Sequence, residues 1–342
     1  MKRPTYTAIL VIVLLNLLAI TTPVAVTEGT PRATPKTSTS EMQASQTSIS
    51  GLQQANVTSC IDITKPGYYI VSNSITGVQK DKNYCIGIFA NNVVLDGRGY
   101  TLSSSQGIGI YVYQTTNTTI KNIKTTGYET GILLTKSSNI KITSITASNH
   151  RSYGIYIEGS NNTLRGVVAM NNGRHGIYIN GSGPNNLANV VAVGNGYGGI
   201  ILANSYRVVL TNVTASDNEY YGIYISGSSN VLTNVTANKN GYYGSYSYDG
   251  IYIGGSNNTL RGVVAMNNGR HGIYINGSGP NNLANVVAVG NGYGGIILAN
   301  SYRVVLTNVT ASDNEYYGIY ISGSSNVLTN VTANKNGYYG SY

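Results

Sequence analysis

Acidic side chains are scarce in this sequence, and this scarcity limits the chemistry that it can support. The 342 residues include 12 Asp and Glu against 21 Lys and Arg. Cleavage of a glycosidic bond commonly uses two carboxyl groups about 5–9.5 Å apart. Glu158, Asp217 and Glu219, with Arg174 as a basic neighbour, are the best candidates for such chemistry. The fold decides which of these side chains meet.

A four-residue motif, Gly-Ile-x-apolar, recurs along most of the chain. Its copies begin at positions 87, 109, 131, 154, 176, 199, 222, 250, 272, 295 and 318, and GYYI at 67 is interpreted as a divergent first copy. A longer repeat is superimposed on this one. Residues 154–246, the first repeat unit, recur as residues 250–342, the second repeat unit, with one difference: Glu158 against Gly254. Such regularity indicates a structure built by stacking similar turns.

The motif predicts short strands. Its two apolar residues are two positions apart and face one side of a strand, while the residue between them faces the other. A second apolar set, Leu164, Val167 and Ala169, recurs at a fixed offset, and Gly, Asn and Ser fill the turns between the strands. No segment has the apolar period of a long helix, and the frame of a leucine-rich repeat is absent. We therefore expect an all-β, single-stranded parallel β-helix of about twelve coils of 22–23 residues.

Two columns of side chains follow from this winding. Asparagines at one turn position should stack as a structural ladder along the rod. The ladder consists of Asn172, Asn195, Asn218, Asn240, Asn268, Asn291, Asn314 and Asn336. The middle residue of each motif should face solvent, and most are tyrosines that offer a platform for sugar rings. This tyrosine stripe consists of Tyr111, Tyr156, Tyr178, Tyr224, Tyr252, Tyr274 and Tyr320, with Tyr69, Phe89, Leu133, Ile201 and Ile297 at the other middle positions. Stacked tyrosines also support parallel coils without any ligand, and the two interpretations are compatible.

The N-terminal segment suggests export. Residues 1–26 combine a basic start with a 13-residue apolar run (8–20), which suits a secretory signal peptide; an uncleaved anchor is the alternative. Residues 27–55 are rich in Thr, Ser and Pro and predict a linker, and the β-helix should span 56–342. We therefore expect a secreted or cell-surface protein with no membrane span in the mature chain.

Two further features fit an exported protein. Cys60 and Cys85 suggest one disulfide joining the first coils, with a pair of buried free thiols as the alternative. Asn-x-Ser/Thr sequences offer ten glycosylation sites. These are Asn56, Asn117, Asn161, Asn180, Asn212, Asn234, Asn257, Asn276, Asn308 and Asn330.

The stretches CIDITKPGYYIVSNSI (60–75) and NNVVLDGRGYTL (91–102), together with the GIYI coils, resemble NosD-like β-helix proteins. The resemblance covers about 56–342 and implies the right-handed parallel β-helix of the pectate-lyase-like superfamily. That fold carries lyases, hydrolases, epimerases, adhesins and structural proteins, so it does not define a function. The NosD-like label also raises copper binding. The candidate ligands are His150, His175, His271, Met42, Met170 and Met266, but their positions do not predict convergence on one ion, and we expect no metal and no cofactor.

The positions of the acidic residues within the repeated coils argue against catalysis. No acid has another acid in register on a neighbouring coil, and the resemblance transfers no catalytic residue, which leaves Glu158, Arg174, Asp217 and Glu219 as weak candidates. A duplicated surface suits binding better than a single cleft. We expect a non-catalytic surface protein that binds polysaccharide or other surface components, or that forms a surface layer. A polysaccharide lyase or hydrolase and a copper-maturation protein are the alternatives. Scattered basic residues exclude nucleic acid as a partner, and the uncapped C-terminal coil suggests end-to-end stacking.

Overall fold

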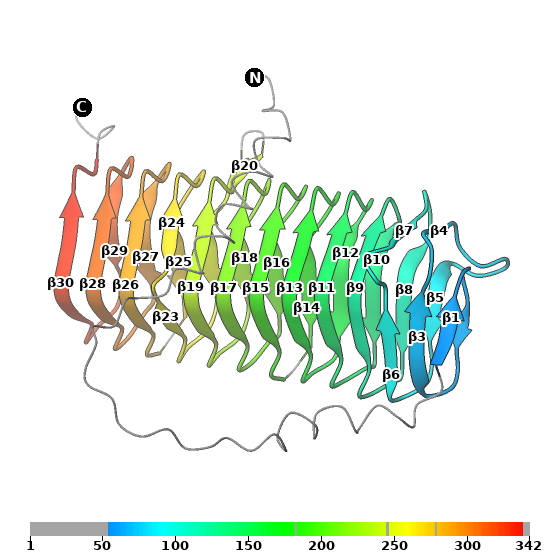
Figure 1. The fold of residues 1–342 in the computed structure, drawn as a ribbon. Coiled ribbons are helices and arrows are strands. Elements are labelled where there is room, and N and C mark those ends of the chain that lie inside the picture. The colour runs from blue at the N-terminus through cyan, green and yellow to red at the C-terminus, as the bar shows by residue number, and fades with distance from the viewer. Residues whose placement is uncertain (1–53, 182, 244–245, 278, 338–342) are drawn as a thin grey trace, which may run out of the picture. The chain divides into compact units, whose positions relative to one another are not determined.

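The strands of this protein wind into a parallel β-helix of about twelve turns (Figure 1). The structure, a computed structural model, describes residues 54–337 apart from 182, 244–245 and 278. These residues contain strands and turns but no helix, and hence no helix suited to crossing a membrane. The prediction of an all-β parallel solenoid is confirmed. The predicted signal peptide (1–26) and nearly all of the predicted linker (27–55) lie outside the described residues and stay predictions.

One sheet carries the Gly-Ile-x-apolar motifs and has twelve parallel strands. In spatial order these are β2 (Asp62–Ile63), β5 (Tyr84–Ile88), β8 (Ile108–Tyr113), β10 (Thr130–Thr135), β12 (Tyr153–Glu158), β14 (Ile177–Asn180), β16 (Ile200–Ala203), β18 (Ile223–Ile225), β22 (Ile251–Ile253), β25 (Ile273–Asn276), β27 (Gly294–Ala299) and β29 (Tyr317–Ile321).

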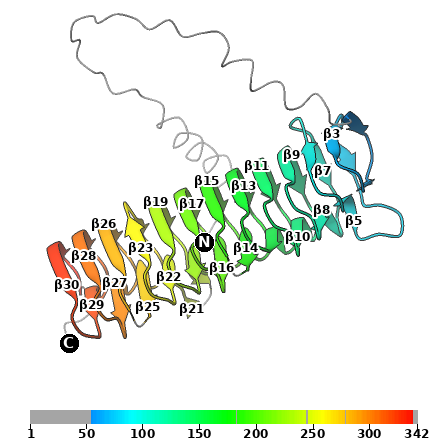
Figure 2. The same cartoon turned by 90° about the horizontal axis from the view of Figure 1, so that it is seen from below.

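The second sheet has sixteen strands and carries the Leu-x-x-Val-x-Ala sets (Figure 2). They are β1 (Gln54–Val57), β3 (Gly67–Val71), β4 (Ile75–Thr76), β6 (Val93–Asp96), β7 (Thr101–Ser103), β9 (Thr119–Thr126), β11 (Lys141–Ser148), β13 (Thr163–Met170), β15 (Asn186–Val193), β17 (Val209–Ser216), β19 (Val231–Asn238), β23 (Thr259–Arg261), β24 (Val264–Met266), β26 (Asn282–Val289), β28 (Val305–Ser312) and β30 (Val327–Asn334). A separate antiparallel hairpin, β20 (Tyr242–Tyr243) and β21 (Tyr246–Ser247), occupies the lengthened coil.

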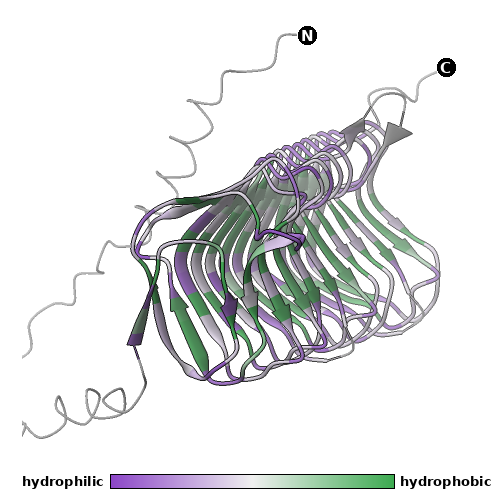
Figure 3. Ribbon diagram, turned by 90° about the vertical axis from the view of Figure 1, so that its right-hand side faces the viewer, coloured by the Kyte–Doolittle hydropathy of each residue, from purple (hydrophilic) through white to green (hydrophobic). Residues whose placement is uncertain are grey.

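Apolar side chains from both sheets fill the interior. Apolar residues, green in Figure 3, recur at the same place in successive coils. In β13, Leu164 and Val167 are three residues apart, yet both are fully buried. Gly166 between them has φ 60°, and Asn189 at the equivalent position of the next coil has φ 55°. A left-handed residue interrupts the alternation of the strand, so two side chains an odd number apart face the same core.

The first position of the motif needs glycine, because atoms of the neighbouring coils leave no space for a Cβ atom there. A Cβ built on Gly199 would lie 2.7 Å from Asn218 Nδ2 and 2.7 Å from the carbonyl oxygen of Gly222. Gly154 and Gly222 meet the Asn172 and Asn240 amides in the same way, at 2.8 and 2.6 Å. The asparagine amides therefore occupy the space that a larger residue at the glycine position would need.

The first coils differ from the predicted frame. GYYI at 67 lies in β3 and pairs with β6 of the sixteen-stranded sheet, so Tyr69 is not a member of the tyrosine stripe. In β5, Gly87 rather than Phe89 pairs with Tyr111, so GIFA at 87 is out of frame and Phe89 is not a member either. The true first copies are 60–63 and 85–88, CIDI and CIGI, because Asp62 pairs with Gly87. Spacing alone favoured the wrong glycine since a cysteine stands at the motif's first position.

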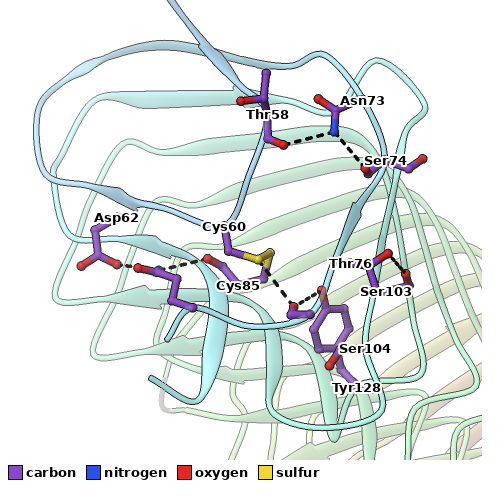
Figure 4. The surroundings of a disulfide bond; sticks show 12 residues. Thr58, Cys60, Asp62, Asn73, Ser74, Thr76, Cys85, Ser103, Ser104 and Tyr128 are labelled. Atoms are coloured by element: carbon purple, nitrogen blue, oxygen red, sulfur yellow. Dashed lines mark hydrogen bonds between the residues drawn. A yellow bond between two sulfur atoms is a disulfide. The ribbon is translucent and has the colours of Figure 1, made fainter. Parts of the chain in front are cut away.

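Cys60 and Cys85 form a disulfide between adjacent coils, with their Cα atoms 4.5 Å apart (Figure 4). Both occupy the position that Gly109 occupies one coil later, because Ile86 pairs with Ile110. The asparagine column has not yet begun at these coils.

Candidate functional site

The tyrosine stripe runs along the outer face of the twelve-stranded sheet, between buried isoleucines. Tyr156 pairs with Tyr178, and Tyr224 pairs with Tyr252. The ring centroids in these pairs are 5.1 and 4.9 Å apart, with interplanar angles of 16° and 5°. Tyr274 continues the second stack at 5.5 Å from Tyr252. The rings form ordered apolar surfaces edged by hydroxyl groups, which suits contact with the apolar faces and hydroxyls of sugars.

A second row of tyrosines flanks the stripe, just before each strand. Tyr197 stacks on Tyr220 at 4.7 Å and 4°, and Tyr220 contacts Tyr248 at 4.4 Å. Tyr293 and Tyr316 form the corresponding pair further along, at 4.6 Å. The aromatic surface is therefore wider than the single column of motif residues.

The stripe is interrupted where isoleucine takes the place of tyrosine. Ile201 and Ile297 were expected to face solvent, but they are only 7% and 5% exposed. A Cβ on Gly198 would lie 2.5 Å from Ile201 Cδ1, so this methyl group fills the space over the glycine. Gly294 leaves the same space for Ile297. The stripe is therefore interrupted between Tyr178 and Tyr224 and again between Tyr274 and Tyr320.

Three histidines lie within or beside the coils. Burial lowers the pKa of His150 and His175 to about 4 and that of His271 to about 3, so all three are neutral at physiological pH. His175 Nδ1 accepts a hydrogen bond of 3.0 Å from the Gly198 N–H. His150 Nε2 lies 3.0 Å from Thr125 Oγ1. These contacts hold the imidazoles in the structure rather than presenting them as acids.

Asp249 is a buried acid that the sequence-based prediction missed. It immediately precedes the motif at 250 and is 1% exposed. The His271 N–H donates to its Oδ1 at 3.3 Å. Burial raises the pKa of Asp249 to about 7, although Arg270 and the His271 N–H oppose this shift. Its equivalent before the first repeat unit is Tyr153, and this substitution of acid for aromatic was the available sequence signal.

The four candidate catalytic residues do not converge on one site. Glu158 ends β12 opposite Thr135 and accepts a hydrogen bond of 3.0 Å from the Tyr156 hydroxyl. Arg174 is exposed at the turn before β14. Ion pairs in the described residues involve only Asp62 and Asp96, so none of the four candidates takes part in one.

Asp217 and Glu219 share an open pocket of about 500 Å³ beside the inserted hairpin. Asn218, Lys239, Tyr242 and Asn267 complete its lining. The Tyr242 hydroxyl donates to the Asn267 carbonyl oxygen at 3.0 Å. Burial raises the pKa of the Asp217 carboxyl, opposed by Lys239. The insertion thus gives one coil a concave surface whose lining includes acidic, basic and aromatic side chains.

The eight ladder asparagines form a continuous hydrogen-bonded column. Asn195 Nδ2 donates to Asn218 Oδ1 at 2.9 Å, and the Asn195 N–H donates to the same oxygen at 3.1 Å. The same pattern repeats from Asn172 to Asn336, and the His150 N–H donates to Asn172 Oδ1 below the first rung. Seven of the eight amides are buried, so this column supports the fold and is not available to a ligand.

The glycosylation sequences lie mainly at exposed turns and strand edges. Nine of the ten asparagines are exposed, and Asn180 is half-buried. Asn212 and Asn234 also form an outer amide ladder, since Asn234 Nδ2 donates to Asn212 Oδ1 at 3.2 Å. Their accessibility is compatible with modification, which stays a prediction.

The described residues do not fit a copper site. They hold no group of three or more His, Cys, Asp or Glu side chains that could bind a metal ion. His150 lies next to the asparagine column, whereas His175 and His271 hold equivalent positions before motif strands four coils apart, so the three imidazoles do not gather at one site. Met42 lies outside the described part of the chain.

Comparison with known families supports the expected fold. Residues 198–342 match the family described as "Right handed beta helix region", and residues 89–247 match "Periplasmic copper-binding protein (NosD)". The predicted resemblance to NosD-like right-handed β-helix repeats is confirmed by these matches. A search of curated proteins by sequence found no match.

Solved structures resemble this chain in fold alone. The A-module of the mannuronan C-5 epimerase AlgE6 of Azotobacter vinelandii is 13% identical with a TM-score of 0.57, over 83% of this chain and 91% of that one. The catalytic domain of a GH87 alpha-1,3-glucanase, in complex with tetrasaccharides, is 15% identical with a TM-score of 0.59. That match covers 84% of this chain and 60% of the glucanase chain. Both proteins act on polysaccharides by their names, which does not assign an activity here.

Proposed function

We propose that this NosD-like right-handed parallel β-helix binds polysaccharide along its tyrosine stripe without cleaving it. The observation that carries the proposal is the stack of half-exposed rings, Tyr224, Tyr252 and Tyr274, along three successive coils. Sugar rings stack on such surfaces through their apolar faces, and the tyrosine hydroxyls supply hydrogen bonds. Epimerases and glucanases of similar fold, whose names state polysaccharide chemistry, support the substrate class.

A location outside the cytoplasm is part of this proposal. The disulfide between Cys60 and Cys85 suits an oxidising compartment. The NosD family description names a periplasmic protein, and the basic, apolar N-terminal segment is typical of an export signal. Stacking of rods through their ends remains a separate, untested prediction.

Glycan-array binding tests the proposal directly. The triple variant Tyr156→Ser/Tyr178→Ser/Tyr224→Ser should lose at least tenfold in affinity for the polysaccharides that the wild-type protein binds, since each lost ring removes stacking surface. Tyr206 and Tyr302 are 49% and 46% exposed but lie in turns away from the stripe. Their replacement by Ser is the matched control and should leave binding unchanged. Equal losses in both variants, or no glycan bound by the wild type, would contradict the proposal.

Polysaccharide cleavage is the second candidate, and the shared pocket of Asp217 and Glu219 is the observation in its favour. Release of reducing sugar or of unsaturated product from a panel of polysaccharides would reveal it. Turnover that disappears in Asp217→Asn or Glu219→Gln, with the fold intact by circular dichroism, would replace the binding proposal. Glu158→Gln serves as a further test because Glu158 lies on the stripe itself.

A further inference from the structure

The two repeat units differ in charge at one place on the aromatic surface. MNNGRHGIYI occurs at 170–179 and again at 266–275, so Arg174 and Arg270 have identical local sequence. Their surroundings differ because Tyr153 and Glu158 in the first case correspond to Asp249 and Gly254 in the second. Arg174 can therefore serve as a matched comparison for Arg270 within the same chain.

Arg270 is exposed, and its side chain lies beside the Tyr274 ring. Its guanidinium is 5.9 Å from the centroid of the Tyr274 ring. Its backbone bonds to Tyr248 on one neighbouring coil and to Tyr293 on the other, at 3.1 and 2.7 Å. No ion pair involves Arg270 in the part of the chain that the structure describes. A cation held beside an aromatic ring and outside any ion pair is suited to bind an anion from solution.

The equivalent place in the first repeat unit is less suited to an anion. Arg174 lies next to Tyr153, and its N–H donates to the Ser152 carbonyl oxygen on the neighbouring coil at 2.8 Å. The Glu158 carboxylate lies close enough to Tyr178 to act on it electrostatically. Tyr178 is the counterpart of Tyr274, so an anion approaching this ring meets a negative charge. Gly254 removes that charge from the second unit.

Asp249 is a buried acid that lies close enough to Arg270 to interact with it electrostatically. The charged and titratable groups around it are Tyr221 on the preceding coil, Tyr248 beside it in the chain, and Arg270 and His271 on the following coil. His271 is neutral, so Arg270 is the only cation among these groups. A protonated Asp249 leaves the Arg270 charge free for a ligand. An ionised Asp249 offsets part of that charge.

We propose that Arg270 and the tyrosines around it bind an anionic group of the polysaccharide, and that ionisation of the buried Asp249 weakens this binding as the pH rises. This inference rests on the proposed function and specifies it: the ligand is an acidic polysaccharide, and the second repeat unit holds the subsite for its carboxylate or sulfate. Linkage requires that a bound anion raises the pKa of Asp249, so affinity falls across the range in which Asp249 ionises.

Two polymers with the same backbone test the charge preference. Carboxymethylcellulose is anionic and hydroxyethylcellulose is neutral, and affinity electrophoresis measures both with the full chain at pH 5.5. We expect the anionic polymer to bind at least tenfold more tightly. Arg270→Gln should remove this preference, whereas Arg174→Gln should change it less than twofold. Gly254→Glu, which restores the charge of Glu158, should also reduce it. Binding of the neutral polymer should be the same in all variants.

The same measurement at pH 8.5 tests the role of Asp249. Ordinary carboxylates and the three histidines do not change charge between pH 5.5 and 8.5, given their pKa values. Wild-type affinity for carboxymethylcellulose should fall three- to tenfold over this range. Asp249→Asn, whose amide keeps the acceptor oxygen, should bind equally well at both pH values. Circular dichroism confirms that each variant is folded.

The possible results distinguish the anionic subsite, the role of Asp249 and the proposed function from one another. Equal affinity for the two polymers, or equal effects of Arg270→Gln and Arg174→Gln, would overturn the anionic subsite while leaving polysaccharide binding intact. A pH dependence that persists in Asp249→Asn would overturn the role of Asp249. Failure of the wild-type protein to bind either polymer would contradict the proposed function as well.

Discussion

Single residues in this rod act through identical neighbours one coil away. Each ladder asparagine uses its amide NH₂ and its oxygen within the column, and it also bonds a backbone carbonyl of the core strand, as Asn218 does with Ala192 at 3.1 Å. Buried groups of this kind are costly to leave without a partner. The column therefore fixes the distance between coils at one corner of the β-helix.

We expect Asn218→Ala to destabilise the protein by about 3 kcal/mol or more, because it leaves the Asn195 and Asn240 amides with unmade buried hydrogen bonds. Thermal unfolding followed by circular dichroism measures the loss. Asn212→Gly is the control, since it removes a similar amide from the exposed outer ladder at a residue with φ 53°. The control should shift stability by less than about 1 kcal/mol. Similar losses in both variants would contradict the role of burial.

Asp249→Asn should make the stability of the protein less sensitive to a rise in pH between about 4 and about 7. The folded pKa of about 7 lies above the ordinary value of 3.8. The folded state therefore binds this proton more tightly, and the wild type loses stability as the pH rises from about 4 to about 7. The stability of the variant relative to wild type should rise over that range by at most about 4 kcal/mol and then level off. Chemical denaturation at pH 4, 5.5, 7 and 8.5 tests this, and a constant difference would contradict it.

At the scale of the elements, the repeat made most of the fold predictable, while local exceptions were not. The spacings of Ile, Leu, Val and Ala predicted the strands of both sheets, because equivalent strands pack against the same kinds of residues in every coil. The frame failed at Gly87, since a cysteine had replaced the motif glycine at the coil's first position. The prediction failed again at Ile201. This side chain is buried because Gly198, three residues earlier, leaves space for it. The sequence did not single out Asp249, because its raised pKa comes from burial and not from its position in a motif.

Gly199→Ala should damage the packing between the glycine and asparagine columns. The new methyl group would meet Asn218 Nδ2 and the Gly222 carbonyl oxygen, both at 2.7 Å, and backbone cannot withdraw without moving a coil. We expect a loss of about 1–3 kcal/mol in unfolding free energy. Gly254→Glu is the matched control, since Glu158 occupies the same position in the first unit. Unchanged stability of Gly199→Ala would refute the close approach.

Removal of the disulfide should loosen only the coils that it joins. The bond closes a loop with a sequence separation of 25, and its loss costs about 3 kcal/mol in the chain-entropy model. Hydrogen exchange should accelerate in β2 and β5 of Cys60→Ser/Cys85→Ser and remain unchanged in β15 and β17, because coils interact with their nearest neighbours. Uniform acceleration along the rod would show that the solenoid unfolds as one unit.

At the scale of the whole molecule, two matching aromatic segments lie about four coils apart, or about 19 Å at 4.8 Å per coil. They are the stacked pairs Tyr156/Tyr178 and Tyr252/Tyr274. A polysaccharide long enough to reach both segments binds the second one at high effective concentration. Affinity should therefore rise steeply once the ligand exceeds this length, as measured by calorimetry with a series of oligosaccharides. Deletion of residues 154–249 removes one segment and joins Tyr153 to Gly250, which begins an almost identical coil. The shortened rod should fold but lose the steep rise; a smooth dependence in both proteins would contradict two-site binding.

The near-identity of the two units also affects how such a protein evolves. Coil 250 continues from the end of the first unit with the same strand pairing that joins β10 to β12 inside the rod. Unequal recombination between the two matching gene segments would insert or remove a whole unit while every new junction repeats an old one. Reach across a surface is then a heritable quantity that changes in steps of about 19 Å, with no redesign of the interior.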